Sequence, residues 1–154
     1  MLFAMEKILV PATGQPEQRT AAETESRLEI SVVFTTVDAT LAALKDAGGL
    51  AKTLNGRITL LVPQAVPFPL PLESPPVLIE FNEKRFREIA SQSPVETAVQ
   101  IYLCRDPIGT LINVLKPGSV VVVGGRKRWW PTREKSLAHK LRKAGHEVVF
   151  KETE

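Results

Sequence analysis

Chemically versatile residues gather in one short segment of this 154-residue chain. Gly124 and Gly125 are followed there by three cations and two tryptophans, which are Arg126, Lys127, Arg128, Trp129 and Trp130. Cationic side chains attract phosphates and other anions, and indole rings are flat surfaces on which a base can stack. A helix expected to begin near Thr132 would add N–H donors and the positive end of its dipole. The segment therefore predicts a site for an anionic ligand that carries an aromatic ring.

A purely structural interpretation of the same segment stays open beside the ligand site. In that interpretation Trp129 and Trp130 cover the open end of a sheet, and the neighbouring cations are simply solvated at the surface. The residue types alone do not choose between the two interpretations.

The three cations also begin a basic stretch that runs from residue 126 to residue 143. It holds eight Lys and Arg residues against one acid, Glu134. The stretch therefore carries +7, and because the whole chain carries +3, the remainder carries −4. Such an asymmetry predicts one positively charged face, which would attract a nucleic acid or an anionic membrane surface. A solvated basic helix explains the same residues.

The chain offers no recognisable catalytic centre. Its histidines, His139 and His146, fall near the last predicted helix and strand, and no Ser-His-acid arrangement, paired-carboxylate motif or Walker loop is visible. The single cysteine, Cys104, excludes an internal disulfide and a cysteine-built metal site. Its place at the end of an apolar run predicts a buried core residue. The sequence therefore favours a non-enzymatic protein and predicts no metal site.

The elements that must position these residues begin with short apolar runs rich in Val and Ile. Polar residues, Gly or Pro bound each run, which indicates strands, and their nearly continuous apolar character indicates burial on both faces of a parallel sheet. The strands are predicted at 30–34, 58–62, 99–103, 120–123 and 148–150.

Segments with helical periodicity lie between these strands. Apolar stripes predict helices over 41–51, 77–90, 108–115 and 137–144. Asn55-Gly56 would end the first in a left-handed conformation, Asp106 with Pro107 would begin the third, and Gly145 would end the last. The alternation of five strands with four helices predicts one α/β domain of three layers, α/β/α, around a five-stranded parallel sheet.

Two stretches do not fit this alternation. Residues 62–76 hold six of the twelve prolines, which predicts an extended surface loop instead of a helix or a central strand. Residues 1–27 are predicted to be an N-terminal extension ahead of a domain at 28–154. The polar stretch 15–27 has too few apolar residues for a crossover helix. Residues 7–10 would therefore form an added edge strand, in their own sheet or in that of a partner chain.

The opening residues make a poor secretory signal because Glu6 and Lys7 interrupt a short apolar stretch and no small-residue cleavage site follows. No apolar run in the sequence approaches the roughly 20 residues that a membrane-spanning helix needs. We therefore expect a cytoplasmic protein without a transmembrane segment.

Three local patterns and their order resemble a known family. Residues 41–44, 50–51 and 57–62 match a helix and the strand after it, Asp106-Pro107-Ile108 matches the start of a later helix, and residues 119–125 match a strand with terminal glycines. Together they resemble the universal stress proteins over roughly residues 28–151. The resemblance implies strand order 3-2-1-4-5, a Rossmann-like fold of the adenine-nucleotide alpha-hydrolase type and a role in stress response. It also implies a homodimer that pairs through the last strand, here Val148, Val149 and Phe150.

The resemblance also implies where a nucleotide would bind. Ligands of doubly wound sheets lie outside the carboxyl ends of the strands where the strand order reverses, here between residues 35–40 and 124–132. ATP-binding members of the family have an Asp after the first strand, and a Gly-x-x-Gly run with a later Gly-Ser/Thr cradles the phosphates. The Asp position falls on Thr35, with Thr36 next, and Asp38 falls on the first helical turn.

The glycine cradle is incomplete in this chain. Gly124 and Gly125 are present, but no further glycine precedes Gly145. Because glycines let backbone N–H groups approach phosphates, we expect the chain not to bind ATP in the family manner. Ser136 stands where the hydroxyl partner belongs. The candidate ligand-binding residues are Thr35, Thr36, Asp38, Gly124, Gly125, Arg126, Arg128, Trp129 and Ser136.

Three functions follow, in order of preference. The first is a dimeric regulatory or interaction module, of the kind the resemblance implies, that binds a protein partner. The second is a sensor of ATP, another adenine nucleotide or another phosphorylated ligand that uses the loop 126–130. The third is attachment to a nucleic acid or an anionic surface through the basic face 126–143, for which nucleic acid is the least favoured partner.

Overall fold

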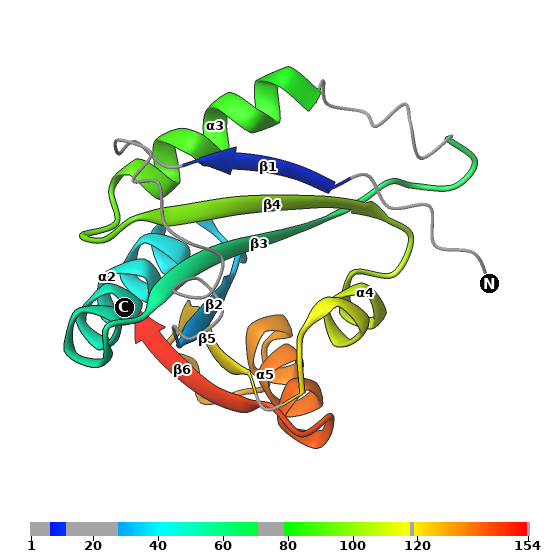
Figure 1. The fold of residues 1–154 in the computed structure, drawn as a ribbon. Helices are drawn as coiled ribbons and strands as arrows, with labels where there is room; N and C mark the ends of the chain where they lie inside the picture. The colour runs from blue at the N-terminus through cyan, green and yellow to red at the C-terminus, as the bar shows by residue number, and fades with distance from the viewer. Residues whose placement is uncertain (1–6, 12–27, 71–78, 118, 154) are drawn as a thin grey trace.

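Six strands form one sheet in the computed structural model of the protein, which describes residues 7–11, 28–70, 79–117 and 119–153. The strands are β1 (Lys7–Pro11), β2 (Glu29–Val33), β3 (Arg57–Ala65), β4 (Thr97–Cys104), β5 (Val120–Arg126) and β6 (Glu147–Thr153). The helices are α2 (Val37–Leu54), α3 (Ile79–Ser91), α4 (Pro107–Val114) and α5 (Arg133–Lys143). In the sheet the strands lie in the order β1-β4-β3-β2-β5-β6 (Figure 1).

The five strands from β2 to β6 are mutually parallel. Numbered from β2 along the chain, they lie in the order 3-2-1-4-5, which confirms the predicted topology. Strand β2 is central, with β3 on one side and β5 on the other. The strand order therefore reverses between β2 and β5.

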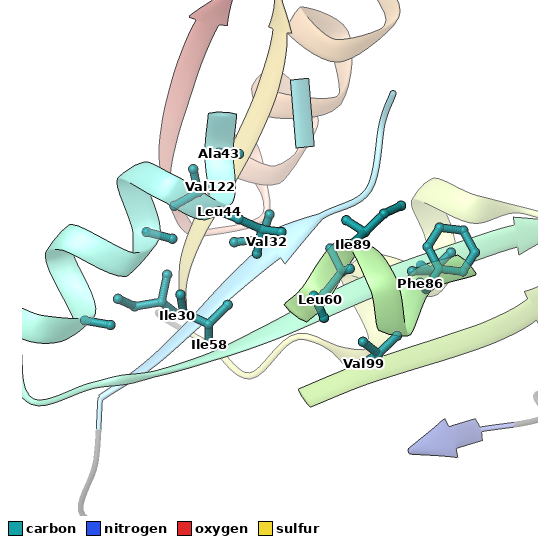
Figure 2. Packing of buried hydrophobic residues seen from close by; sticks show 14 of the residues in the cluster. Ile30, Val32, Ala43, Leu44, Ile58, Leu60, Phe86, Ile89, Val99 and Val122 are labelled. Atoms are coloured by element: carbon teal, nitrogen blue, oxygen red, sulfur yellow. The ribbon is translucent and has the colours of Figure 1, made fainter. Parts of the chain in front are cut away.

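Two apolar layers cover the sheet because successive side chains of a strand point to opposite faces. On one face Ile30 and Val32 of β2 join a cluster with Leu44 of α2 and Phe86 of α3 (Figure 2). On the other face, the neighbouring Val33 joins a second cluster that includes residues of α4 and α5, among them Leu111, Leu137 and Leu141. The predicted three-layer α/β/α arrangement is confirmed.

The helix ends follow the predicted signals, with one difference. Thr36 caps α2, and its hydroxyl accepts a hydrogen bond from the N–H of Ala39 at 3.3 Å. Asn55 ends the same helix in the left-handed conformation, with φ 52°. Asp106 precedes α4, and Pro107 opens it, but the Asp106 side chain makes no capping hydrogen bond. Gly145 follows α5 with φ 97°.

The proline-rich stretch differs from its prediction because β3 continues through Pro63 to Ala65, paired with β4. The carbonyl of Leu61 accepts from Phe34, so odd-numbered residues of β3 face β2. Strand β2 ends opposite Leu61, and the missing N–H of Pro63 therefore faces no neighbouring strand. A proline is tolerated at such a local edge. The part of this stretch beyond residue 70 lies outside the described residues.

Strand β1 confirms the added edge strand predicted for residues 7–10. It pairs antiparallel with β4, from Lys7 opposite Tyr102 to Pro11 opposite Ala98, so it joins the sheet of its own chain. The rest of the predicted extension, residues 1–6 and 12–27, lies outside the described residues. In the ranges that the structure covers, no helix has both the length and the apolar character that a bilayer crossing requires.

Candidate functional site

The point where the strand order reverses is bridged by the protein itself. Just after β2, the hydroxyl of Thr35 donates a hydrogen bond to the carbonyl oxygen of Gly124 in β5, at 2.8 Å. The backbone N–H of Thr35 in turn donates to the hydroxyl of the fully buried Thr40, at 3.1 Å. The structure thus brings two predicted site residues together, Thr35 and Gly124, and joins them directly to each other.

The two glycines at the end of β5 allow two helices to approach closely. A Cβ on Gly124 would lie 2.2 Å from the carbonyl oxygen of Ala39 in the first turn of α2. A Cβ on Gly125 would lie 2.6 Å from the ring of Phe150 and 2.8 Å from Cβ of Glu134 in α5. Both glycines therefore have a packing role that needs no phosphate.

The other polar residues predicted around the crevice serve as ordinary helix residues. Thr36 is the cap of α2, and Asp38 lies exposed in its first turn, where a carboxylate favours the positive end of the helix dipole. Ser136 lies exposed in the first turn of α5, and its N–H donates to the carbonyl of Thr132. None of the hydrogen bonds of the described residues joins these three side chains to Gly124 or Gly125.

The loop 126–130 is strongly exposed. Trp129 has 91% of its surface in contact with solvent and Trp130 has 45%, so Trp129 does not cover the sheet as the structural interpretation required. The two indole rings meet edge to face, with centroids 5.4 Å apart. The guanidinium of Arg128 lies over the ring of Trp130, at 5.1 Å from its centroid. The loop thus presents a nearly free indole beside a cation–π pair.

The basic stretch forms an exposed surface around α5. Its apolar residues Leu137 and Leu141 face the core, whereas seven of its eight basic side chains are exposed. The eighth, Lys135, is half-buried and donates to the carbonyl of Arg128. Binding of an anionic partner to this surface stays a prediction.

Strand β6 forms one border of the sheet and pairs only with β5 among the described strands. Val148 and Phe150 pack against the cluster that α5 covers, while Val149 lies on the opposite side and is 38% exposed. Lys151 forms an ion pair with Asp46 of α2 at 3.5 Å. The outer border of β6 thus pairs with no other strand of the described residues, and dimerisation through it stays a prediction.

A polar hollow of about 280 Å³ lies on the sheet face that α4 covers only in part. Its lining comes from the beginnings of β2 and β3, from β4 and from the end of α4, and consists of Glu29, Ser31, Arg57, Thr59, Leu61, Gln100, Tyr102, Val114, Leu115, Lys116 and Ser119. None of these residues was among the predicted site residues. The available signal was the alternation in β2 and β3, where Glu29, Ser31, Arg57 and Thr59 place polar side chains at every second position on one face.

Two buried ionisable side chains have raised pKa values. Burial raises the pKa of Tyr102 in the hollow, and the charge of Glu29 raises it further. Burial also raises the pKa of the Cys104 thiol. Cys104 is buried as predicted, with Sγ 3.7 Å from the carbonyl oxygen of Gln64. Such a protonated thiol is a poor nucleophile.

Comparisons with known proteins agree with this fold. No protein-family model matches the chain, and a search of curated proteins found no match. Among solved structures, a universal stress protein from Archaeoglobus fulgidus is 13% identical with a TM-score of 0.54, and the match covers 80% of this chain and 92% of that one.

Two further structures are similar over the same share of this chain. A universal stress protein in complex with cAMP is 14% identical, with a TM-score of 0.52 and 95% of its own chain covered. The Archaeoglobus fulgidus protein in complex with dAMP is 12% identical, with a TM-score of 0.50 and 96% of its chain covered. The chain therefore has the fold of the universal stress proteins, as the sequence patterns predicted.

Proposed function

We propose that the protein is a non-catalytic, cytoplasmic regulatory or interaction module that dimerises through β6 and does not bind ATP through a glycine cradle. The observation that carries the proposal is the outer border of β6, which offers backbone donors and acceptors to another strand. Edge strands with free backbone groups readily pair with a second chain.

The hydrogen-bonding pattern identifies which backbone groups of β6 face outward. The N–H of Glu147 donates to the carbonyl of Ser119 at 3.1 Å, and the carbonyl of Thr153 accepts from Lys127 at 2.6 Å. In a parallel pair every second residue bonds to the same neighbour. The odd-numbered residues of β6 therefore face β5, and the backbone groups of Val148, Phe150 and Glu152 face the free border.

The second part of the proposal rests on the closed reversal point. A nucleotide held in the family manner needs backbone N–H groups free to approach its phosphates. Here Gly124 and Gly125 accommodate α2, Phe150 and α5, and Thr35 stands where ATP-binding members of the family have an Asp. The glycines that remain are therefore explained by packing alone.

The dimer is tested by replacing one outward residue in two ways. Glu152→Pro removes an outward N–H without removing a bond to β5, whereas Glu152→Ala removes the same side chain and keeps the N–H. Light scattering across a concentration series should give twice the 17.0 kDa chain mass for the wild type and for Glu152→Ala. For Glu152→Pro we expect dissociation at concentrations at least tenfold higher. A monomeric wild type, or equal dissociation of the two variants, would exclude pairing through β6.

The nucleotide part of the proposal has its own measurement. Calorimetric titration with ATP, at low and at physiological salt, should give no saturable heat. Saturable binding in the micromolar range would overturn this part and leave the dimer result unaffected.

A second candidate function, a sensor of an adenine nucleotide or another phosphorylated ligand, is favoured by the exposure of Trp129. An indole that is 91% exposed beside Arg128 is free to stack on a base while nearby cations hold a phosphate. Two of the similar structures contain cAMP and dAMP. In this function Arg126 and Arg128 hold the anion.

Charge-matched variants distinguish this sensor from general attraction to the basic surface. The double variant Arg126→Gln with Arg128→Gln removes two charges from the loop, and Lys140→Gln with Lys143→Gln removes two from α5. If the sensor exists, AMP or cAMP quenches tryptophan emission saturably in the α5 variant and not in the loop variant. Equal weakening of nucleotide binding in both double variants would contradict a site in the loop.

A further inference from the structure

The polar hollow exists because helix α4 is too short to cover its side of the sheet. The helix has eight residues and ends at Val114, and its Leu111 joins the apolar cluster that contains Leu61 of β3 and Tyr102 of β4. The beginnings of β2 and β3 carry Glu29, Ser31, Arg57 and Thr59 toward the same side. A sheet face without a helix above it would normally be solvated. Here the end of α4 and Lys116 form a wall instead, and the result is a hollow.

Arg57 brings a buried donor without a partner into this hollow. Its Nε–H is buried and donates to no acceptor, and no hydrogen bond or ion pair of the rest of its guanidinium is found among the described residues. A buried donor without a partner destabilises the folded state, and more strongly where it is charged. A bound carboxylate would remove that cost, because a guanidinium binds carboxylates through two parallel hydrogen bonds.

The carboxylate of Glu29 limits which ligands fit the hollow, because it disfavours further negative charge and can accept hydrogen bonds from a ligand. The carboxylate accepts a hydrogen bond from the Thr59 hydroxyl at 3.2 Å and lies 3.7 Å from Nζ of Lys116. A dianion such as a phosphate monoester would meet this negative charge inside the hollow, so a singly charged ligand fits better. A ligand hydroxyl can donate to the remaining lone pairs of Glu29.

Gln100 and Tyr102 supply the other side of the hollow. The Tyr102 hydroxyl donates to Oε1 of Gln100 at 2.5 Å. With that oxygen occupied, the amide nitrogen of Gln100 is the group left to donate to a ligand oxygen. Ser31, whose surface is 6% exposed, adds a hydroxyl on the floor. The lining thus offers one cation for an anion and several neutral groups for hydroxyls.

We propose that this hollow binds a small hydroxylated carboxylic acid, with its carboxylate on Arg57 and its hydroxyl groups toward Glu29 and Gln100. The volume of about 280 Å³ lies below the range of pockets for drug-sized ligands, which suits a small metabolite. The site is separate from the reversal point of the sheet and from the loop 126–130. Binding here is therefore independent of the proposed dimer and of nucleotide sensing.

The chain provides a single reporter for this site, because Tyr102 is its only tyrosine. Protein labelled with ¹³C at tyrosine Cζ only gives one labelled resonance, which arises from the wall of the hollow. Gluconate and lactate should shift this resonance saturably. Acetate should bind more weakly because it lacks the hydroxyl, and glycerol should leave the resonance unchanged because it lacks the carboxylate.

Two variants and a charge-matched control decide the assignment. Arg57→Gln should weaken gluconate or lactate binding at least tenfold, and Lys116→Gln by less, because its side chain is 82% exposed. Arg87→Gln removes one charge from an exposed residue of α3, which packs on the opposite face of the sheet, and should bind like the wild type. Ser31→Ala, a small change on the floor, should weaken binding severalfold and serves if Arg57→Gln fails to fold.

Three results would overturn the proposal. The first is a tyrosine resonance that no hydroxylated acid shifts at millimolar concentration. The second is binding that Arg57→Gln and Ser31→Ala both leave unchanged. The third is inorganic phosphate that shifts the resonance at concentrations equal to or lower than those of the hydroxy acids, because a general anion site is then present.

Discussion

At the scale of single residues, the point where the strand order reverses combines two glycines that allow close packing with a threonine that hydrogen-bonds to the neighbouring strand. Gly124 admits the first turn of α2, and Gly125 admits Phe150 and Glu134. Thr35, at the position where the resemblance to the ATP-binding universal stress proteins predicts an Asp, bonds to Gly124. A glycine pair at the end of a strand is therefore no indication of phosphate binding unless its packing is known.

The packing role of Gly124 predicts the effect of adding one methyl group. Gly124→Ala should destabilise the fold by about 1–3 kcal/mol, because the new Cβ meets a backbone carbonyl that cannot move alone. The matched control is Gly49→Ala in α2, where nothing lies within 4 Å and the change should stabilise the helix by about 0.5–1 kcal/mol. Denaturant unfolding followed by circular dichroism measures both. Equal stability of the two variants would contradict the packing role.

The raised pKa values of Cys104 and Tyr102 predict lower stability in alkaline solution. Their pKa values rise from the ordinary 9.0 and 10.0, mainly through burial. Below pH 9 both groups keep their protons in the folded and unfolded states. Above it the unfolded chain releases protons first, so the free energy of unfolding falls as pH rises toward the folded-state pKa values. Unfolding curves at about pH 8 and about pH 10 measure the decrease, and Cys104→Ala should reduce it. An unchanged pH dependence in that variant would show that Cys104 does not contribute.

At the scale of elements, the strands were predictable because burial on both faces leaves long runs of Val and Ile. The same criterion missed the hollow. Glu29 and Arg57 are the first residues of β2 and β3, and a search for apolar runs places both strands one residue later, at Ile30 and Ile58. Whether their side chains meet in a hollow depends on the register of the two strands and on the length of α4. Neither can be deduced from local composition.

The position of residues 66–70 in the proline-rich stretch depends on the side chain of Arg105. Arg105, which follows β4, donates to the carbonyls of Val66 at 2.8 Å and of Leu70 at 2.6 Å. Its guanidinium lies over the ring of Phe68, 5.7 Å from the centroid. Arg105 therefore fastens residues 66–70 to the end of the sheet, an arrangement between residues far apart in sequence that the proline content did not predict.

This contact predicts how fast the backbone amide of Leu70 exchanges its hydrogen with solvent. The N–H of Leu70 donates to the carbonyl of Pro67 at 2.9 Å, and the carbonyl of Leu70 accepts from Arg105. Arg105→Gln should increase the exchange rate of this amide, followed by NMR, several-fold, because the carbonyls of Val66 and Leu70 lose their charged donor. Arg128→Gln, an exposed arginine elsewhere, should not change it. Equal rates in the two variants would show that Arg105 does not hold the segment.

At the scale of the whole molecule, the sheet has two different borders. Strand β6 borders it on one side with a parallel strand, and β1 borders it on the other, antiparallel to β4 (Figure 1). The core between them, from β2 to β6, already has both helical layers. Strand β1 therefore adds a border beside β4, and the boundary at residue 28 stays a prediction.

This arrangement predicts the behaviour of a chain that begins at residue 28. It should keep a cooperative unfolding transition and its helical circular dichroism, because both apolar clusters of the described residues are built from residues after 28. It should also associate more strongly than the full chain at equal concentration, because the border of β4 is left uncovered. Light scattering and thermal denaturation measure the two effects. Loss of cooperative unfolding would place the boundary before residue 28.

The exposure of both tryptophans has a consequence for the optical properties of the protein. Indole emission moves to longer wavelength in water, and Trp129 and Trp130 already meet water in the folded chain. The native protein should therefore emit like an unfolded one, and its denaturation should be almost silent in fluorescence. A shift of the emission maximum to shorter wavelength would instead show that a bound molecule has covered the loop 126–130. The emission wavelength is therefore a direct assay for a partner.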